Sequence, residues 1–355
     1  MKIYIVLLSV IITAAGTGCK KNNTGTNNPS TGKKVVVTTI AGEGTGAFAD
    51  GPALSAKFNA PTDVIVAADG TLFVTDYKNH RIRKIAAGQV TTFAGNDNFV
   101  IVNGKGISAQ FNTPFRIASD AGSNLYTVEQ VDTHVRKISP AADVTFYAGT
   151  SMPGYLNGSA VTAQFQYDAA GIVADEDGTI YIVDTFNGRI RKIDPSGQVS
   201  TLAGSGTMGF RDAAAEMAQF NYPDGIAIDK EGNLYVSDAA NFRIRKITPA
   251  GVVSTLAGSG VKGTLDGNAG SAQFNDMGDM VADSEGNLYI ADDNRIRKIT
   301  PQGVVSTIAG GAVGYADGDG ARARFAYPAG LGIDAHNNIY VADANNNRIR
   351  KISFE

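Results

Sequence analysis

The sequence predicts an all-β protein, a six-bladed β-propeller built from four-stranded antiparallel blades. The leading observation is a five-residue segment, RIRKI, that recurs at 81–85, 189–193, 243–247, 295–299 and 348–352, with a variant, HVRKI, at 134–138. The copies are spaced by about 53 residues, and a period of this order is typical of stacked or radial repeat proteins. A unit of that size buries too little apolar surface alone, so the copies are expected to share their cores.

Each copy is expected to contribute four short strands, and the fourth copy is the clearest example. Apolar, β-favouring runs stand at 225–229, 234–237, 243–248 and 252–256, separated by turns rich in Gly, Asn, Pro and Asp. Runs of this length and composition are typical of strands joined by hairpins. Six such units predict a ring of six four-stranded blades.

The two ends of the repeat region predict how the ring closes. The last copy has a third strand at 348–352 but no fourth, whereas residues 35–42 match the fourth-strand pattern without a blade of their own. The amino-terminal strand is therefore expected to complete the last blade and to remove two exposed sheet edges.

Composition limits the classes of partner. The chain has 355 residues, 43% of them hydrophobic, and a formal net charge of −3. This balance lacks the basic excess that drives nucleic-acid binding, so nucleic acid is not an expected partner. The single cysteine, Cys19, allows no intramolecular disulfide.

The amino-terminal segment predicts export. Residues 1–18 have the charged start, apolar core and small-residue end of a signal peptide. Cys19 follows it and resembles the lipidated cysteine of bacterial lipoproteins, although Gly16 stands where that motif usually has leucine. The alternatives are ordinary secretory cleavage and a retained membrane anchor, for which the apolar run is short. Residues 19–34 are then a lipidated cysteine and a flexible tether, and residues 35–355 the propeller. The expected location is a bacterial envelope membrane, periplasmic or at the cell surface, with the membrane contacted only through the lipid anchor.

The repeat resembles the NHL repeat family, in which a GIAID-like strand, a GNLYVAD segment, an asparagine and RIRKI follow one another. Residues 223–247 match this pattern, and the resemblance extends over 35–355. The fifth copy departs from it by lacking two residues between Asp292 and Arg295, and the third has Ala169 where the others have proline. The resemblance implies a propeller but leaves the function open, because NHL propellers serve as enzymes, protein binders and RNA binders.

Several residue types recur once per copy and are expected to be structural. A phenylalanine in each long connection is expected to fill the space between blades: Phe58, Phe111, Phe165, Phe220, Phe274 and Phe325. An acid ends each second strand and is expected to pair with arginines of the RIRKI strand: Asp76, Glu129, Asp184, Asp238, Asp292 and Asp343. Asp-Gly and Asn-Gly pairs in the connections, at Asp50, Asn103, Asn157, Asp266 and Asp317, are interpreted as turns. Calcium binding at the acidic turns 175–177 or 317–319 is the alternative to a purely structural role there.

Functional residues are expected where the copies differ. Each inner strand begins at the rim of the central channel, with Thr62 and Asp63, Phe115 and Arg116, Ala170 and Gly171, Asp224 and Gly225, Gly278 and Asp279, and Ala329 and Gly330 at these positions. The hypothesis is a small polar ligand pocket at the channel mouth, formed by Asp63, Phe115, Arg116, Asp224, Asp279, Glu129 and His134. The alternative is that the second copy has drifted and that Arg116 only neutralises nearby acids.

These observations favour a binding or scaffold module for a protein, peptide or glycan partner at the face that carries the long connections. The expected state is a monomer, and no catalytic residues, metal ligands or cofactor are assigned. The alternative is a lactonase-like hydrolase or an amidating-lyase-like enzyme with its site at the channel mouth. His80, His134 and His336 are placed too far apart to share one zinc ion.

Overall fold

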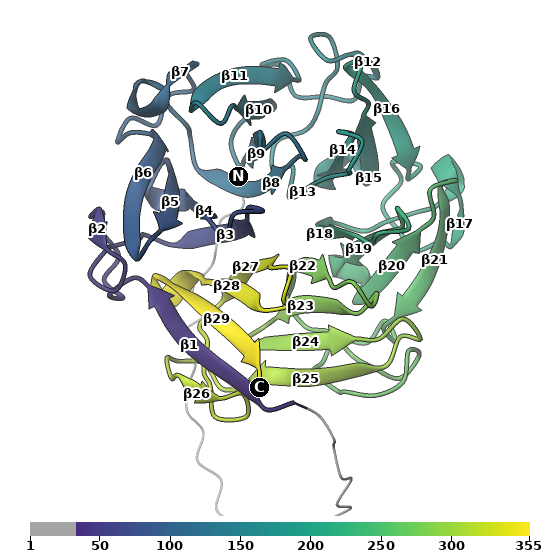
Figure 1. The fold of residues 1–355 in the computed structure, drawn as a ribbon. Helices are drawn as coiled ribbons and strands as arrows, with labels where there is room; N and C mark the ends of the chain where they lie inside the picture. The colour runs from purple at the N-terminus through teal and green to yellow at the C-terminus, as the bar shows by residue number, and fades with distance from the viewer. Residues whose placement is uncertain (1–32) are drawn as a thin grey trace, which may run out of the picture. The chain divides into compact units, whose positions relative to one another are not determined.

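In the computed structural model, residues 33–355 are described. The predicted signal peptide, Cys19 and nearly all of the predicted tether lie outside the described residues, so those interpretations stay predictions. Within 33–355 the chain forms six antiparallel sheets arranged as blades around a central axis (Figure 1). The predicted six-bladed all-β propeller is confirmed.

Each blade has four main strands, numbered here from the axis outward. The inner strands are β3 (Pro61–Val66), β8 (Pro114–Ser119), β13 (Gly171–Ala174), β18 (Pro223–Ile228), β22 (Met277–Ala282) and β27 (Pro328–Ile333). The second strands are β4 (Leu72–Asp76), β9 (Leu125–Glu129), β14 (Ile180–Asp184), β19 (Leu234–Asp238), β23 (Leu288–Asp292) and β28 (Ile339–Asp343). The third strands, which contain the RIRKI segments, are β5 (Arg81–Ala86), β10 (Val135–Ile138), β15 (Arg189–Ile193), β20 (Arg243–Ile247), β24 (Arg295–Ile299) and β29 (Arg348–Phe354). The outer strands are β6 (Gln89–Gly95), β11 (Asp143–Ala148), β16 (Gln198–Ala203), β21 (Val252–Ala257), β25 (Val305–Gly310) and β1 (Val35–Ala41).

A short fifth strand, which the sequence analysis did not predict, extends five of the blades. It comes from the long connection that leads into the same blade and pairs with the outer strand: β2 (Gly51–Pro52), β7 (Gly104–Lys105), β12 (Gly158–Ser159), β17 (Ala213–Ala214) and β26 (Gly318–Asp319). In the fifth blade the same pairing is reduced to a single bridge between Gly267 and Val305. Single-turn 3-10 helices complete the connections: η1 (Tyr77–Asn79), η2 (Gly106–Ser108), η3 (Thr185–Asn187), η4 (Ala215–Met217), η5 (Ala239–Asn241) and η6 (Ala344–Asn346).

Ring closure follows the predicted pairing. Strand β1 lies antiparallel to β29, with Val35 opposite Phe354 and Val37 opposite Ile352. In Figure 1 the purple β1 runs beside the yellow β29 at the outer edge of the last blade. The first and last strands of the repeat region therefore belong to one sheet.

The core is divided among the interfaces between neighbouring blades. The six repeated phenylalanines are each at most 1% exposed. Phe58, for example, packs in one cluster with Val64 and Val74 of the first blade and with Ala342 and Ile349 of the last. The interpretation of these residues as packing elements between blades is confirmed, and their burial contributes about 2–3 kcal/mol each.

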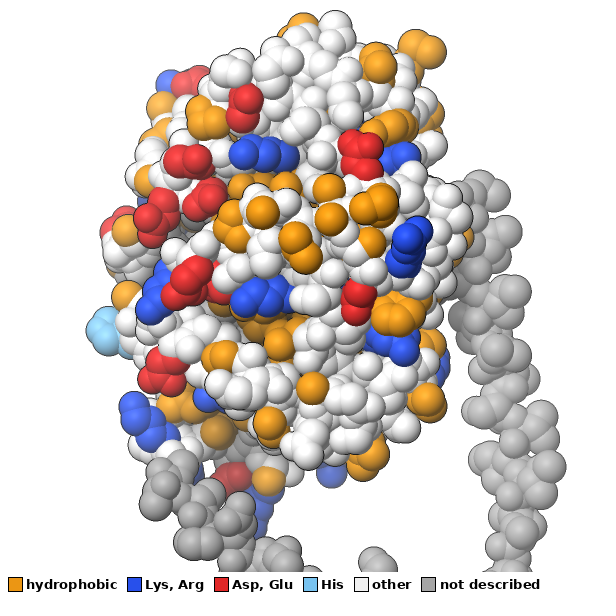
Figure 2. Space-filling view, turned by 90° about the vertical axis from the view of Figure 1, so that its right-hand side faces the viewer, with side chains coloured by type: hydrophobic (Ala, Val, Ile, Leu, Met, Phe, Trp, Pro, Cys, Tyr) orange, Lys and Arg blue, Asp and Glu red, His pale blue; other side chains and the backbone are white. Residues whose placement is uncertain are grey.

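The outer surface carries charges of both signs. On the side of the ring shown in Figure 2, basic and acidic side chains are interspersed, with apolar side chains between them. This side therefore lacks a single-sign field that would attract a highly charged polymer.

Candidate functional site at the channel mouth

The inner strands approach one another so closely at their amino-terminal ends that backbone and side chains fill the channel there. A Cβ added at Gly225 would lie 2.4 Å from the carbonyl oxygen of Gly278 in the next blade. A Cβ at Gly330 would lie 2.4 Å from Oδ1 of Asp63. Glycine is required at these positions because any side chain would collide with the neighbouring blade.

Four charged residues, called here the channel cluster, occupy this constriction: Asp63, Arg116, Asp224 and Asp279. The guanidinium of Arg116 reaches three other blades. Its Nη1 donates to the carbonyl oxygen of Thr62 at 2.8 Å, and its Nε donates to that of Ala170 at 3.1 Å. Its Nη2 lies 3.4 Å from Oδ1 of Asp224. Arg116 is 3% exposed, so it plugs the channel more than it presents a charge to solvent.

The two buried acids of the cluster join neighbouring inner strands. Asp63 accepts hydrogen bonds from the backbone N–H of Val64 and, across the blade interface, from that of Ile117, both at 2.8 Å. Asp279 accepts from backbone N–H groups of its own blade and of both adjacent blades: Met280, Ile226 and Leu331. Each carboxylate therefore connects inner strands that no β-sheet hydrogen bond joins.

Burial sets the electrostatics of the cluster. Burial raises the pKa of Asp63, the charge of Asp279 raises it further, and Arg116 lowers it. Burial likewise raises the pKa of Asp279, against the lowering effect of Arg116. Although burial alone would lower the pKa of Arg116, the surrounding acids raise it, with Asp279 the largest contributor among them. One guanidinium thus faces two fully enclosed carboxyl groups, and the excess negative charge favours keeping a proton on one of them.

Above the cluster lies a shallow cavity of about 30 Å³. Its lining includes Phe115, Arg116, Asp224 and Tyr327, together with Asp276 and Asp293. This volume holds one or two water molecules and excludes a larger ligand from the channel. Any larger ligand on this face would have to bind at the rim.

The structure does not bring Glu129 and His134 into this cluster. Glu129 is fully buried and its Oε1 accepts from Nη1 of Arg136 at 3.0 Å. The Nδ1 of His134 is 2.7 Å from Asp132, and its ring packs on Phe146 of the outer strand. Of the seven residues proposed for the mouth, Asp63, Phe115, Arg116, Asp224 and Asp279 gather there.

Glu129 belongs instead to a unit repeated in all six blades. The second arginine of each RIRKI strand is fully buried and pairs with the acid that ends the second strand: Arg83 with Asp76, Arg136 with Glu129, Arg191 with Asp184, Arg245 with Asp238, Arg297 with Asp292 and Arg350 with Asp343. A register shift next to this arginine recurs in the pairing of the third and outer strands of all six blades. The prediction of hairpin ion pairs is confirmed.

The Asp-Gly and Asn-Gly pairs have a second role that the turn interpretation missed. The positive φ belongs to the glycine, as at Gly51 and Gly318, while the preceding side chain binds the buried arginine. Asp50 pairs with Arg83 at 2.6 Å, and Asp317 pairs with Arg350 at 2.5 Å. The recurrence of an acid or amide at this position, where glycine alone would make the turn, was the available signal.

The channel cluster does not fit a divalent metal. The guanidinium of Arg116 stands among the carboxylates where a cation would need to sit, and the oxygens of Asp63 are already bound to backbone N–H groups. Within residues 33–355 no three His, Cys, Asp or Glu side chains converge as metal ligands.

Comparison with known proteins agrees with this architecture. A model of the NHL repeat matches residues 58–85 and 325–352, and a model of the SMP-30/Gluconolactonase/LRE-like region matches 168–265. The chain is an NHL-repeat β-propeller. The residues at the channel mouth that differ between the copies are therefore deviations from a structural unit that all six blades share.

Similar known proteins match most of this chain, but they do not establish its function. SUPPRESSOR OF QUENCHING 1 of Arabidopsis thaliana is 27% identical over 274 residues, which are 72% of this chain and 26% of that protein. This chain therefore spans about a quarter of the length of that relative. An auxiliary nutrient binding protein from Bacteroides thetaiotaomicron has a TM-score of 0.68 and 19% identity, covering 91% of this chain and 77% of that one. A gluconolactonase from Xanthomonas campestris has a TM-score of 0.56 and 12% identity, covering 90% and 89%. At these identities the two structures show the fold alone.

Proposed function

We propose that this NHL propeller is a binding module whose ligand surface is the rim of the channel mouth, with a protein, peptide or glycan as the partner. The observation that carries the proposal is a set of half-exposed aromatic side chains on this face. Tyr167, Tyr222 and Tyr327 are 45%, 42% and 45% exposed, and each stands just before an inner strand. Tyrosine offers a large apolar face and a polar tip, which suits it to contact surfaces of this kind.

Two of these tyrosines have an unusual backbone conformation. Tyr222 and Tyr327 have φ values of 48° and 54°, in the left-handed region that non-glycine residues rarely adopt. The turn after the second strand is tied to the same segment, since the backbone N–H of Ala344 donates to the carbonyl oxygen of Tyr327. Such strain is retained where the surrounding structure fixes it, and it gives the rim a preorganised shape.

The proposal includes a tether to the cell envelope. The lipobox-like Cys19 and the signal-peptide pattern of residues 1–18 support it. No helix among residues 33–355 is long and apolar enough to cross a bilayer. We expect a Cys19→Ala variant to lose incorporation of a labelled fatty acid and to leave the membrane fraction; unchanged labelling would contradict the anchor.

The ligand surface is tested by probing glycan and peptide arrays with the full-length chain and then titrating the strongest hits. We expect the Tyr222→Ala/Tyr327→Ala variant to weaken binding by about tenfold or more, because each aromatic anchor contributes on the order of 1 kcal/mol. Phe146→Ala is the matched control, since Phe146 is 44% exposed on outer strand β11. A rim variant that binds as tightly as the control would refute the rim as the ligand surface.

A lactonase- or lyase-like activity is the second candidate, favoured by the match of residues 168–265 to the gluconolactonase-like region. The group placed to act at the mouth is Asp224, whose side chain is 33% exposed beside Arg116. Hydrolysis of aldonolactones by the full-length chain, lost in Asp224→Asn, would support this candidate; an equal rate in both proteins would remove it.

A further inference from the structure

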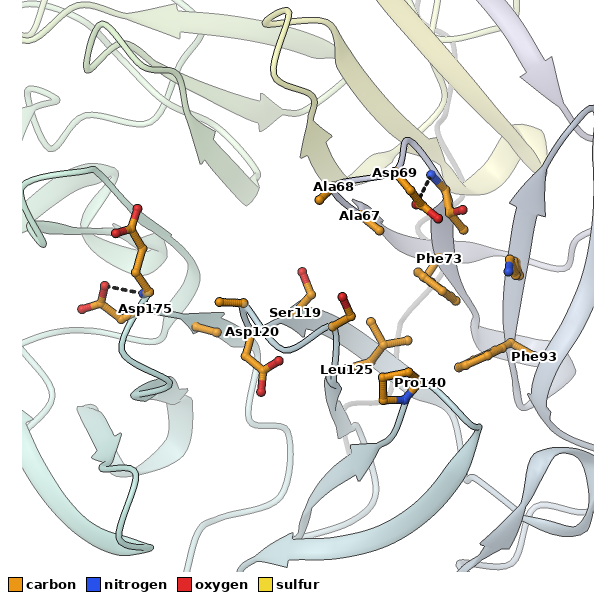
Figure 3. A pocket seen from close by; sticks show the side chains of 16 residues that line it. Ala67, Ala68, Asp69, Phe73, Phe93, Ser119, Asp120, Leu125, Pro140 and Asp175 are labelled. Atoms are coloured by element: carbon orange, nitrogen blue, oxygen red, sulfur yellow. Dashed lines mark hydrogen bonds between the residues drawn. The ribbon is translucent and has the colours of Figure 1, made fainter.

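A second cavity lies on the opposite face of the propeller, where the hairpins between inner and second strands turn. It encloses about 540 Å³ and spans the first three blades (Figure 3). Its lining comes from the hairpins at 67–71, 119–125 and 174–176, together with Phe73, Lys84, Phe93 and Pro140. A volume of this size is typical of sites for small organic ligands.

The cavity lies where the first blade departs from the other five. The other blades have an aspartate at the start of this turn and a tyrosine six residues later. In four of them the tyrosine O–H donates to the aspartate at 2.9–3.1 Å: Tyr126 to Asp120, Tyr235 to Asp229, Tyr289 to Asp283 and Tyr340 to Asp334. The first blade has Ala67 and Phe73 at these positions, so it lacks both the carboxylate and the hydroxyl.

The paired replacement leaves an apolar end in the cavity. The rings of Phe73 and Phe93 meet edge to face with centroids 4.9 Å apart. Figure 3 shows these rings with Leu125 and Pro140 at one end of the cavity. Ala67 and Phe73 therefore remove from this surface the carboxylate and the hydroxyl that the other blades have at these two positions.

The rest of the cavity is acidic. Asp175 lies at the end away from the two rings in Figure 3, and Asp120 lies between. The lining contains four carboxylates, the other two being Asp69 and Glu176, against the single ammonium group of Lys84. Asp120 already accepts from Asn124 and Tyr126, and Asp175 accepts from the backbone N–H of Glu176. Asp120 and Asp175 are thus held in place, and the combined field of the four carboxylates attracts a cation.

We propose that this cavity is a second binding site, for a small organic cation that carries its ammonium group on an aromatic or branched apolar body. The apolar body would lie against Phe73 and Phe93, and the ammonium group would point toward Asp175 and Glu176. The inference rests on the cavity alone and is independent of the rim surface on the other face.

The charge requirement is tested with three probes that share one phenyl body: 2-phenylethylamine, its neutral N-acetyl derivative and the anion 3-phenylpropionate. Binding to the full-length chain is followed by NMR line broadening of each probe. We expect the amine to bind at millimolar concentration, and the neutral and anionic probes to bind at least about fivefold more weakly. Absence of amine binding, or equal binding of the anion, would overturn the proposal.

The location is tested with variants of the cavity wall. Ala67→Leu fills the apolar end without adding charge, and we expect it to abolish amine binding; Ala121→Leu, in the second blade's hairpin, is a second blocking variant if the first fails to fold. Glu176→Gln should weaken binding by about threefold to tenfold. Glu285→Gln, a change of the same kind in the fifth blade's hairpin, should leave it unchanged. Wild-type affinity in a folded blocking variant, or an equal loss in Glu285→Gln, would place binding elsewhere and refute the site.

Discussion

The two faces of the propeller differ although the same repeat builds both. At the face that carries the long connections, Arg116 and three acids fill the channel and leave about 30 Å³ of open space. At the hairpin face, replacement of one Asp–Tyr pair by Ala67 and Phe73 accompanies a cavity of about 540 Å³. A repeat protein therefore has two routes to a local feature, the addition of charged side chains or the loss of a shared contact. Only the added charged side chains, which here form the channel cluster, should contribute a large share of the free energy of unfolding.

The largest expected effect lies in neither of these features but in the unit that all blades share. Arg245→Ala should lower the free energy of unfolding by about 3–5 kcal/mol, because it leaves Asp238 buried without its 2.6 Å partner. Chemical denaturation measures the loss. Arg243→Ala, which removes a more exposed arginine stacked on Phe210, should cost only about 1 kcal/mol. Equal losses would mean that burial does not distinguish the two arginines.

At the channel mouth, Arg116→Met should lower the free energy of unfolding by about 2–4 kcal/mol. The variant leaves Asp63 and Asp279 enclosed without a cation and leaves two carbonyl oxygens without their donors. Lys84→Met at the hairpin-face cavity should change stability by less than about 0.5 kcal/mol. If Arg116→Met lowered the free energy of unfolding less than Lys84→Met, the expected difference between the two faces would be wrong.

The channel cluster should also make stability depend on pH. Burial raises the pKa of Asp63 from 3.8 to about 8, so between these values the folded state holds a proton that the unfolded state has released. The contribution of Asp63 to the free energy of unfolding should therefore be largest below about pH 4. It should fall as the pH rises toward 8, by on the order of 1–3 kcal/mol.

Denaturation curves between pH 5 and pH 8 measure this slope. Burial raises the pKa of Glu129 to about 7, which adds to the slope with the same sign. Asp63→Asn should therefore reduce the slope without removing it. A slope that the substitution leaves untouched would show that Asp63 is ionised throughout this range.

A small gain in stability is expected at the hairpin face. Ala67→Asp/Phe73→Tyr restores the hydrogen-bonded pair of the other blades and should raise the free energy of unfolding by about 0.5–1.5 kcal/mol. Thermal unfolding measures the gain, and Tyr235→Phe in the fourth blade should cost a similar amount. A loss of stability in the double variant would show that the first blade has adapted to its missing pair.

The repeat made most of the fold predictable from the sequence. The RIRKI spacing indicated six blades, and the unpaired strand at 35–40 indicated that ring closure runs through β1 and β29. The buried arginines and the phenylalanines between blades followed from their recurrence. The fifth strands were missed because a two-residue strand such as Gly51–Pro52 leaves no periodic pattern.

The candidate site was less predictable because it depends on distances across the ring. Alignment of the copies placed Asp63, Arg116 and Asp279 at one rim position and Asp224 at the position before it. It did not show that Arg116 reaches across to the fourth blade and closes the channel. Glu129 and His134 were assigned to the mouth because the second blade deviates there, although Glu129 keeps the ion pair that every blade has. Ala67 and Phe73 are equally visible deviations from the other copies, but the sequence does not show the cavity that they line.

The pairing of β1 with β29 also determines when this protein is able to finish folding. The residues that meet there are about 300 positions apart, so β1 leaves the ribosome long before its partner exists. Contacts between residues so far apart in the sequence form slowly, and until its partner is available an unpaired strand is prone to associate with other chains. Export in an unfolded form would suit this topology, because strand closure would then be the last event, after β29 has reached the same compartment.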